Sequence, residues 1–167
     1  MKSAKQLTQC ALLISLALVL SYMERFFPLQ VLIPLPGIKL GLANIVTLVS
    51  LQCLGKRSTV LILVLRCVLG SMFGGGITGL AFSLTGGLFS VAVMIMVSRV
   101  PLFSIYGISI LGAAAHNIGQ ICAAVVLMET IYILAYLPWL LLTALATGFA
   151  TGAMAAGVLR ILSTQVK

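Results

Sequence analysis

Acidic residues are nearly absent from this sequence of 167 residues, which has no aspartate and only two glutamates, Glu24 and Glu129. An enzyme that holds Mg²⁺ and diphosphate needs clustered carboxylates, as prenyl diphosphate synthases have. The phosphate-binding patterns GxxxxGK[ST] and GxGxxG are missing as well. No pair of carboxylates and no nucleophile beside a base is evident. We therefore expect no enzymatic activity, no ATP hydrolysis by this chain, no metal site and no cofactor.

Charged residues of both signs make up only 7% of the chain, and hydrophobic residues make up 62%. Soluble domains carry roughly 25% charged residues, so this chain cannot cover a folded surface with polar groups. The net charge of +8 comes from cations placed between apolar runs, as membrane topology requires. These features predict an integral membrane protein and exclude a nucleic-acid-binding protein.

The apolar runs predict one transmembrane domain over residues 1–167, an all-α bundle of six helices. A spanning helix needs about 20 apolar residues, and charges or helix breakers separate the candidate runs. The expected spans are residues 7–27, 38–54, 58–73, 80–98, 103–128 and 138–162.

The distribution of Lys and Arg orients these spans. With a cytoplasmic N-terminus, Arg25 and Lys39 are the two cations outside, together with both glutamates. Such an excess inside satisfies the positive-inside rule and predicts that both termini are cytoplasmic. The cations expected inside are Lys2, Lys5, Lys56, Arg57, Arg99, Arg160 and Lys167.

Arg66 is the strongest single indication of a site. It lies about eight residues into the third span, which is roughly 12 Å deep at the rise of an α-helix. A buried arginine in a membrane must find a partner. Two interpretations are open: a structural arginine bonded to carbonyls or a carboxylate, and an anion-binding group that faces a cavity.

The fifth span carries a polar cluster in the run "AAAHNIGQ". His116 and Gln120 are four residues apart and share a helix face, and Asn117 lies beside them. Such side chains in a membrane need other helices, water or a ligand, so the cluster is either structural or substrate-facing. We predict that these residues and Arg66 line one polar cavity.

Small residues at a spacing of four occur in the first and last spans. The first span has the pairs Ala11 with Ser15 and Ala17 with Ser21, and the last has Gly148 with Gly152. Small residues let helix backbones approach closely. They can serve packing within the bundle or form a docking surface for another membrane subunit.

Two motifs, "PGIKLGLANIVTL" and "RCVLGSMFGGGITGLAFSLTGGLFS", support a resemblance over nearly the whole chain. The sequence resembles small bacterial membrane proteins known as heptaprenyl diphosphate synthase component I or as the Gx transporter family. That family is similar to the substrate-binding S components of energy-coupling factor (ECF) transporters. The resemblance implies an S-component-like bundle in the bacterial cytoplasmic membrane, whose first helix docks on a transmembrane coupling subunit at Ala11, Ser15, Ala17 and Ser21.

The resemblance also implies a role for the loop after the first helix, which would close over an outward-facing pocket. Lys39 and Asn44 follow this loop and would then bind substrate, although an ordinary interfacial anchor is an equal alternative for Lys39. The glycine run after Phe73 is read as a loop or gate over the same pocket. The candidate substrate-binding residues are Arg66, His116, Asn117, Gln120, Lys39 and Asn44.

The function expected from these features is binding and uptake of a small, possibly anionic molecule, vitamin-like or isoprenoid-related, driven by partner ATPases through a coupling subunit. The alternative is a non-catalytic membrane subunit of an isoprenoid or quinone system, such as a heptaprenyl diphosphate synthase component, or of a flavin-linked electron-transfer system.

Overall fold

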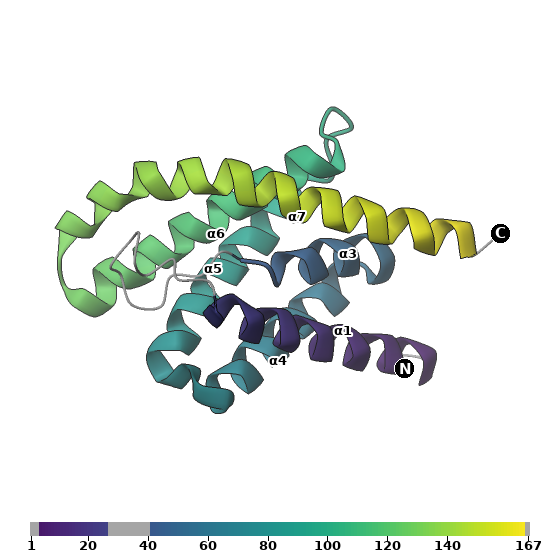
Figure 1. The fold of residues 1–167 in the computed structure, drawn as a ribbon, viewed down its shortest axis with the longest axis horizontal. Coiled ribbons are helices and arrows are strands. Elements are labelled where there is room, and N and C mark those ends of the chain that lie inside the picture. Colours follow the sequence, from purple (N-terminus) through teal and green to yellow (C-terminus); the bar gives the residue numbers. More distant parts are fainter. Residues whose placement is uncertain (1–3, 27–40, 166–167) are drawn as a thin grey trace.

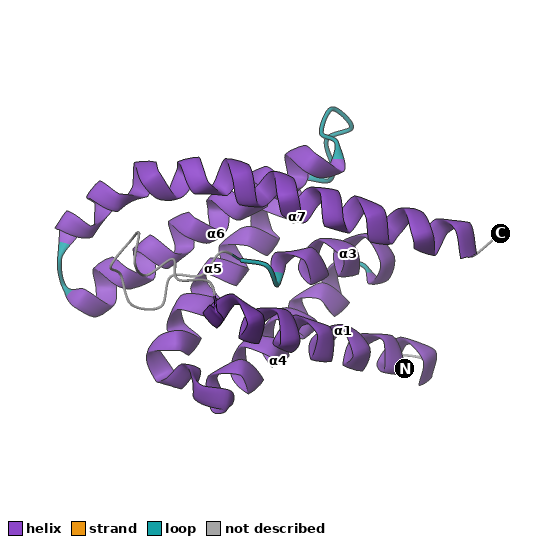
Figure 2. Cartoon of the chain, viewed as in Figure 1, coloured by secondary structure: helices purple, strands orange, loops and turns teal. Residues whose placement is uncertain are grey.

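The computed structural model describes residues 4–26 and 41–165, and every regular element within them is helical (Figures 1 and 2). Lys39 and most of the loop expected to cover the pocket lie outside the described residues. The elements are α1 (Ala4–Met23), η1 (Glu24–Phe26), α3 (Asn44–Leu54), α4 (Lys56–Gly70), η2 (Ser71–Gly75), α5 (Gly76–Val97), α6 (Ile105–Met128), η3 (Ile131–Tyr136) and α7 (Leu137–Gln165).

Five of these helices are long and apolar enough to cross a membrane: α1, α4 together with the start of η2, α5, α6, and α7 together with η3. Helices form in these runs because a backbone in hydrocarbon must satisfy its own hydrogen bonds. The expectation of an all-α, multi-pass membrane protein is thereby confirmed at this coarse level.

The second expected span differs from the prediction. Its helix, α3, begins at Asn44 and has 11 residues, about 16 Å, or roughly half of the hydrocarbon core. Residues 41–43 form a turn, with Gly41 at a φ of 81°. A helix cannot continue through that backbone conformation, so α3 starts inside the bundle.

The glycine run is a tight corner and not the expected loop. After α4 the chain makes one π-helical turn, η2, in which Phe73 and Gly74 leave helical geometry. Gly74 and Gly76 have φ values of 104° and 59°, which glycine adopts without strain. As a result α5 begins at Gly76, four residues before the expected start, and α4 and α5 form a close hairpin.

One end of the bundle collects the cationic segments. The start of α1, the α3–α4 turn, the α5–α6 turn and the end of α7 all lie on the right of Figure 1. Lys56 and Arg57 begin α4, and Arg99 lies in the α5–α6 turn. The acids Glu24 and Glu129 belong to the connections at the opposite end of α1 and α6.

Close backbone contact holds α5, α6 and α7 together. A Cβ added at Gly148 of α7 would stand 2.6 Å from the Cα of Ile110 in α6. A Cβ added at Gly119 of α6 would stand 2.8 Å from the carbonyl oxygen of Thr85 in α5. The Gly148–Gly152 pair therefore serves packing within the bundle. In contrast, α1 lies at the periphery and packs mainly against α4.

Candidate functional site

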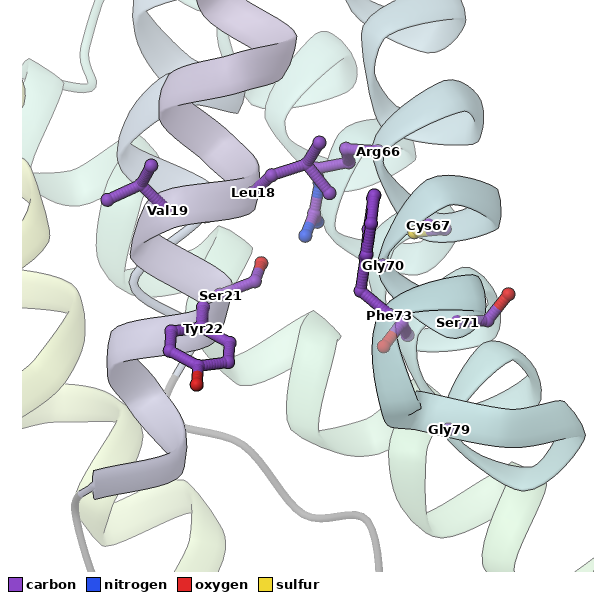
Figure 3. A pocket seen from close by; sticks show the side chains of 11 residues that line it. Leu18, Val19, Ser21, Tyr22, Arg66, Cys67, Gly70, Ser71, Phe73 and Gly79 are labelled. Carbon is purple, nitrogen blue, oxygen red and sulfur yellow. The ribbon is translucent and has the colours of Figure 1, made fainter.

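A cavity of about 380 Å³ lies between α1, α4, η2 and α5 (Figure 3). Its volume falls in the range of small-molecule sites, roughly 300–1,000 Å³. The helix α1 forms one wall, and the α4–α5 hairpin forms the other. The lining residues are Leu18, Val19, Ser21, Tyr22, Arg66, Cys67, Gly70, Ser71, Phe73, Gly79 and Ser83.

Arg66 is the charged residue of this lining. The guanidinium extends from α4 into the space beside α1 (Figure 3), and the side chain is 7% exposed. Its Nε and Nη2 atoms have no hydrogen-bond partner in the part of the chain that the structure describes. Neither glutamate of the sequence lines the cavity. Arg66 is thus a buried cation that faces the cavity.

The other polar candidates lie at a similar depth. By the rise of about 1.5 Å per residue, Arg66 is about 15 Å from the start of α4 and His116 about 16 Å from the start of α6. Asn44 is about 15 Å from the end of α3 by the same rise. These three helix ends share the cationic end of the bundle (Figure 1). The polar residues therefore form a layer near mid-bundle.

His116 and Gln120 pack against α5 at Gly86. A Cβ built on Gly86 would stand 2.9 Å from His116 Cε1 and 3.0 Å from Gln120 Cγ, so only glycine leaves room for these side chains. On the other side, a Cβ on Gly41 would stand 3.7 Å from His116 Cδ2 and 2.9 Å from Asn44 Nδ2. The imidazole is held between two glycines and next to the first turn of α3.

The amides in this layer differ in their hydrogen bonding. Asn117 Nδ2 donates to the carbonyl oxygen of Leu140 in α7, at 2.6 Å. Gln120 is fully buried, and both of its amide atoms lack a partner within the described residues. Asn44 Oδ1 is likewise buried without a partner there. Asn117 joins two helices, whereas Gln120 and Asn44 keep hydrogen-bonding capacity.

The single cavity predicted for Arg66 and the α6 cluster stays a prediction. The cavity described above includes Arg66, but its described lining contains no residue of α6 and not Asn44. The reason is the position of α5, whose Gly87 faces Leu63 of α4 while Gly86 faces α6. Arg66 and His116 both face the interior, but α5 packs between their helices.

The four small residues of α1 do not share one environment. Ala11 and Ser15 are exposed, and Ala17 is fully buried in a cluster with Val46 and Ile62. Ser21 lines the cavity. Ala17 and Ser21 therefore face the interior of this chain, and only Ala11 and Ser15 offer a surface to a neighbouring subunit.

Two features of the site were missed by the sequence reasoning. Tyr22 and Ser83 line the cavity, and nothing in their sequence context indicates it. Glu24 is buried, and its Oε1 accepts a hydrogen bond from the backbone N–H of Leu42, just before α3. Glu24 is one of only two acidic residues in the sequence. Because a negative charge near a helix start is favourable, the sequence could have indicated this contact.

No group of three His, Cys, Asp or Glu residues that could hold a metal occurs in residues 4–26 and 41–165. No curated protein and no solved structure shows a significant match to the chain. The sequence profile of the family described as "Heptaprenyl diphosphate synthase component I" matches residues 13–158. Because this match covers most of the chain and includes every residue of the cavity, the protein belongs to the heptaprenyl diphosphate synthase component I family.

Proposed function

We propose that this protein is the substrate-binding membrane subunit of an ECF-type transporter, taking up a small anionic molecule across the bacterial cytoplasmic membrane. The observation that supports the proposal is Arg66, buried in a cavity with two of its nitrogen atoms unpartnered among the described residues. A charge at this depth is costly unless something neutralises it. A bound anion would supply the missing partner, because guanidinium binds carboxylate or phosphate bidentately.

The energy for uptake would come from partner subunits. The sequence has no GxxxxGK[ST] motif, so ATP hydrolysis belongs to separate ATPases that act through a transmembrane coupling subunit. The exposed Ala11 and Ser15 of α1 form the proposed docking face, since small residues allow close helix approach. The chain itself performs no covalent chemistry in this proposal.

The proposed topology has six crossings with both termini cytoplasmic. Its support is that the first and last described helices begin and end at the cationic end of the bundle (Figure 1), as an even number of crossings predicts. The second crossing is expected from the apolar run at residues 38–54, of which α3 is the described helix. Single cysteines in a background without the four native ones test this. External labelling is expected at Ile77 and Glu129 and not at Lys56 or Arg99, and labelling of Lys56 from outside would overturn the topology.

Native mass spectrometry of the purified protein tests the binding function. We expect a small molecule to co-purify with the native chain and to be lost from Arg66→Leu. The matched control is Arg99→Leu, the same substitution at an exposed turn residue outside the cavity. Retention of the same molecule by Arg66→Leu would show that Arg66 does not bind it.

The family description favours a second candidate, a non-catalytic membrane subunit of a heptaprenyl diphosphate synthase. A subunit of a quinone or flavin-linked electron-transfer system belongs to the same class of alternative. Affinity purification separates the two. A coupling subunit with ATPases would support transport, whereas a soluble synthase or a flavoprotein would support the second candidate. Loss of the ATPases in Ala11→Trp would place the transport partners on α1.

A further inference from the structure

The walls of the cavity are apolar apart from one charge. Leu18 and Val19 from α1 and Phe73 from η2 supply hydrocarbon, and Gly70 and Gly79 leave space. Arg66 is the one charged side chain among the described lining residues, and the remaining polar groups are the hydroxyls of Ser21, Tyr22, Ser71 and Ser83. A ligand that matches this lining is mostly apolar and carries its charge at one end.

The charge balance limits the anionic group. One guanidinium neutralises one negative charge, and its planar fork matches a carboxylate. A diphosphate carries more charge, and protein sites usually balance it with Mg²⁺ held by carboxylates. No acid lines the cavity, and no metal-binding group of three occurs in the described residues. The described part of the lining therefore balances a monoanion and would leave a diphosphate with excess charge.

The outer wall of the cavity lies on the exposed surface of the bundle. Val19 and Tyr22 of α1 are 55% and 56% exposed, and Phe73 is 69% exposed, although all three also line the cavity. An apolar ligand tail that passes between α1 and η2 meets these apolar side chains while its head group reaches Arg66.

From these observations we infer that the cavity binds a small amphiphile with a single carboxylate head group. The carboxylate pairs with Arg66, and the apolar tail lies between α1 and the α4–α5 hairpin. This inference rests on the proposed function and specifies its substrate class. It differs from what the family description suggests, which is a prenyl diphosphate.

Gly79 offers a way to fill the cavity without disturbing the backbone. It lines the cavity, and a Cβ built on it would have no heavy atom within 4 Å. Gly157 of α7 also has nothing within 4 Å, and it does not line the cavity. Substitution of each by phenylalanine therefore makes a matched pair, one that blocks the cavity and one that does not.

The test uses three probes with the same ten-carbon tail: geraniol, geranate and geranyl diphosphate. Equilibrium dialysis against the full chain in nanodiscs, with empty nanodiscs as the blank, measures Kd near neutral pH. We expect geranate to bind at least about tenfold more tightly than either other probe. Arg66→Leu is expected to abolish the preference for geranate over geraniol, and Arg99→Leu to keep it. Gly79→Phe is expected to weaken geranate binding at least about tenfold, and Gly157→Phe to leave it unchanged.

Tightest binding of geranyl diphosphate or geraniol would overturn the carboxylate class, as would unchanged geranate affinity in both Arg66→Leu and Gly79→Phe. If no probe shows saturable binding, the inferred class is wrong. Native mass spectrometry then decides about the function, because a co-purified molecule of another class supports transport and its absence contradicts transport too. Size-exclusion profiles and melting temperatures of each variant ensure that folded proteins are compared.

Discussion

The helices of the α5–α6–α7 half of this bundle pack differently from those of the α1–α4 half. The helices α5, α6 and α7 meet at glycines, where an added Cβ would lie within 3 Å of a neighbouring backbone. Two interhelical hydrogen bonds also occur there, Ser109 with Thr151 at 2.9 Å and Asn117 with the carbonyl oxygen of Leu140, although the Gln120 amide has no partner among the described residues. Around α1 and α4, by contrast, the structure contains a cavity, and two nitrogens of Arg66 have no hydrogen-bond partner among the described residues.

We infer from this difference that one half of the bundle provides stability and the other half provides the proposed binding site. Apolar side chains gain little by associating in lipid, so close backbone packing and interhelical hydrogen bonds must hold the helices together. The α5–α6–α7 half uses both and forms a rigid scaffold. The α1–α4 half contains the cavity and the buried Arg66, where the proposed ligand would bind. Four predictions test this comparison, in order of decreasing effect.

The largest effect is expected from Gly148→Leu. A side chain here collides with the Cα of Ile110, 2.6 Å from the Cβ position, and must push α7 away from α6. We expect a loss of about 3 kcal/mol or more in stability, measured by thermal unfolding in detergent. Gly157→Leu, on the same helix but with open space around it, should melt close to the native protein. Equal melting temperatures for the two variants would refute the close-packed scaffold.

Arg66→Leu is expected to act in the opposite direction and to stabilise the ligand-free protein. Removing an unpartnered buried charge relieves a desolvation cost of about 1–3 kcal/mol. Thermal unfolding of protein stripped of small molecules measures the gain, and Arg99→Leu serves as the exposed control. A lower melting temperature in Arg66→Leu would mean that Arg66 is a structural residue, with bonds that favour the folded state.

The third prediction compares the loss of stability on replacing two amides of α6, Asn117 and Gln120, and the expected effect is smaller. Asn117→Leu removes the hydrogen bond to the Leu140 carbonyl and should cost about 1 kcal/mol, the usual worth of such a bond in a membrane. Gln120→Met keeps the volume of a side chain whose amide has no partner among the described residues, and should cost nothing. Unfolding in detergent compares the two, and a larger loss for Gln120→Met would reveal an unrecognised bond.

The smallest effect on stability is expected from Ala11→Trp. Ala11 is exposed on α1, so the folded chain should change by less than about 0.5 kcal/mol. Association with a coupling subunit should nevertheless be lost in pull-down experiments. Ala17→Trp is the internal contrast, because Ala17 is fully buried and its replacement should destabilise the chain itself. Normal complex formation by Ala11→Trp would mean that the docking face lies elsewhere.

The positions of helices could be predicted from the sequence where contact with lipid hydrocarbon alone determines them. A backbone surrounded by lipid must form helices, so the expected span at residues 103–128 appears as Ile105–Met128 and that at 138–162 as Leu137–Gln165. The prediction was wrong at two places where a glycine leaves helical geometry. Gly41 and Gly74 adopt positive φ values there, which shortens α3 and closes the α4–α5 corner.

The sequence by itself determined that Arg66 lies deep in an apolar helix with no aspartate available to pair with it, because depth follows from residue spacing and charge from composition. Only the tertiary structure decided what surrounds it. Helix rotation and order depend on which small residues touch, as at Gly86 and Gly87 of α5. Their packing puts α5 between Arg66 and His116 and brings Ser21 of α1 to the cavity. Contacts between distant helices arise from packing in three dimensions, so residue spacing along one helix cannot reveal them.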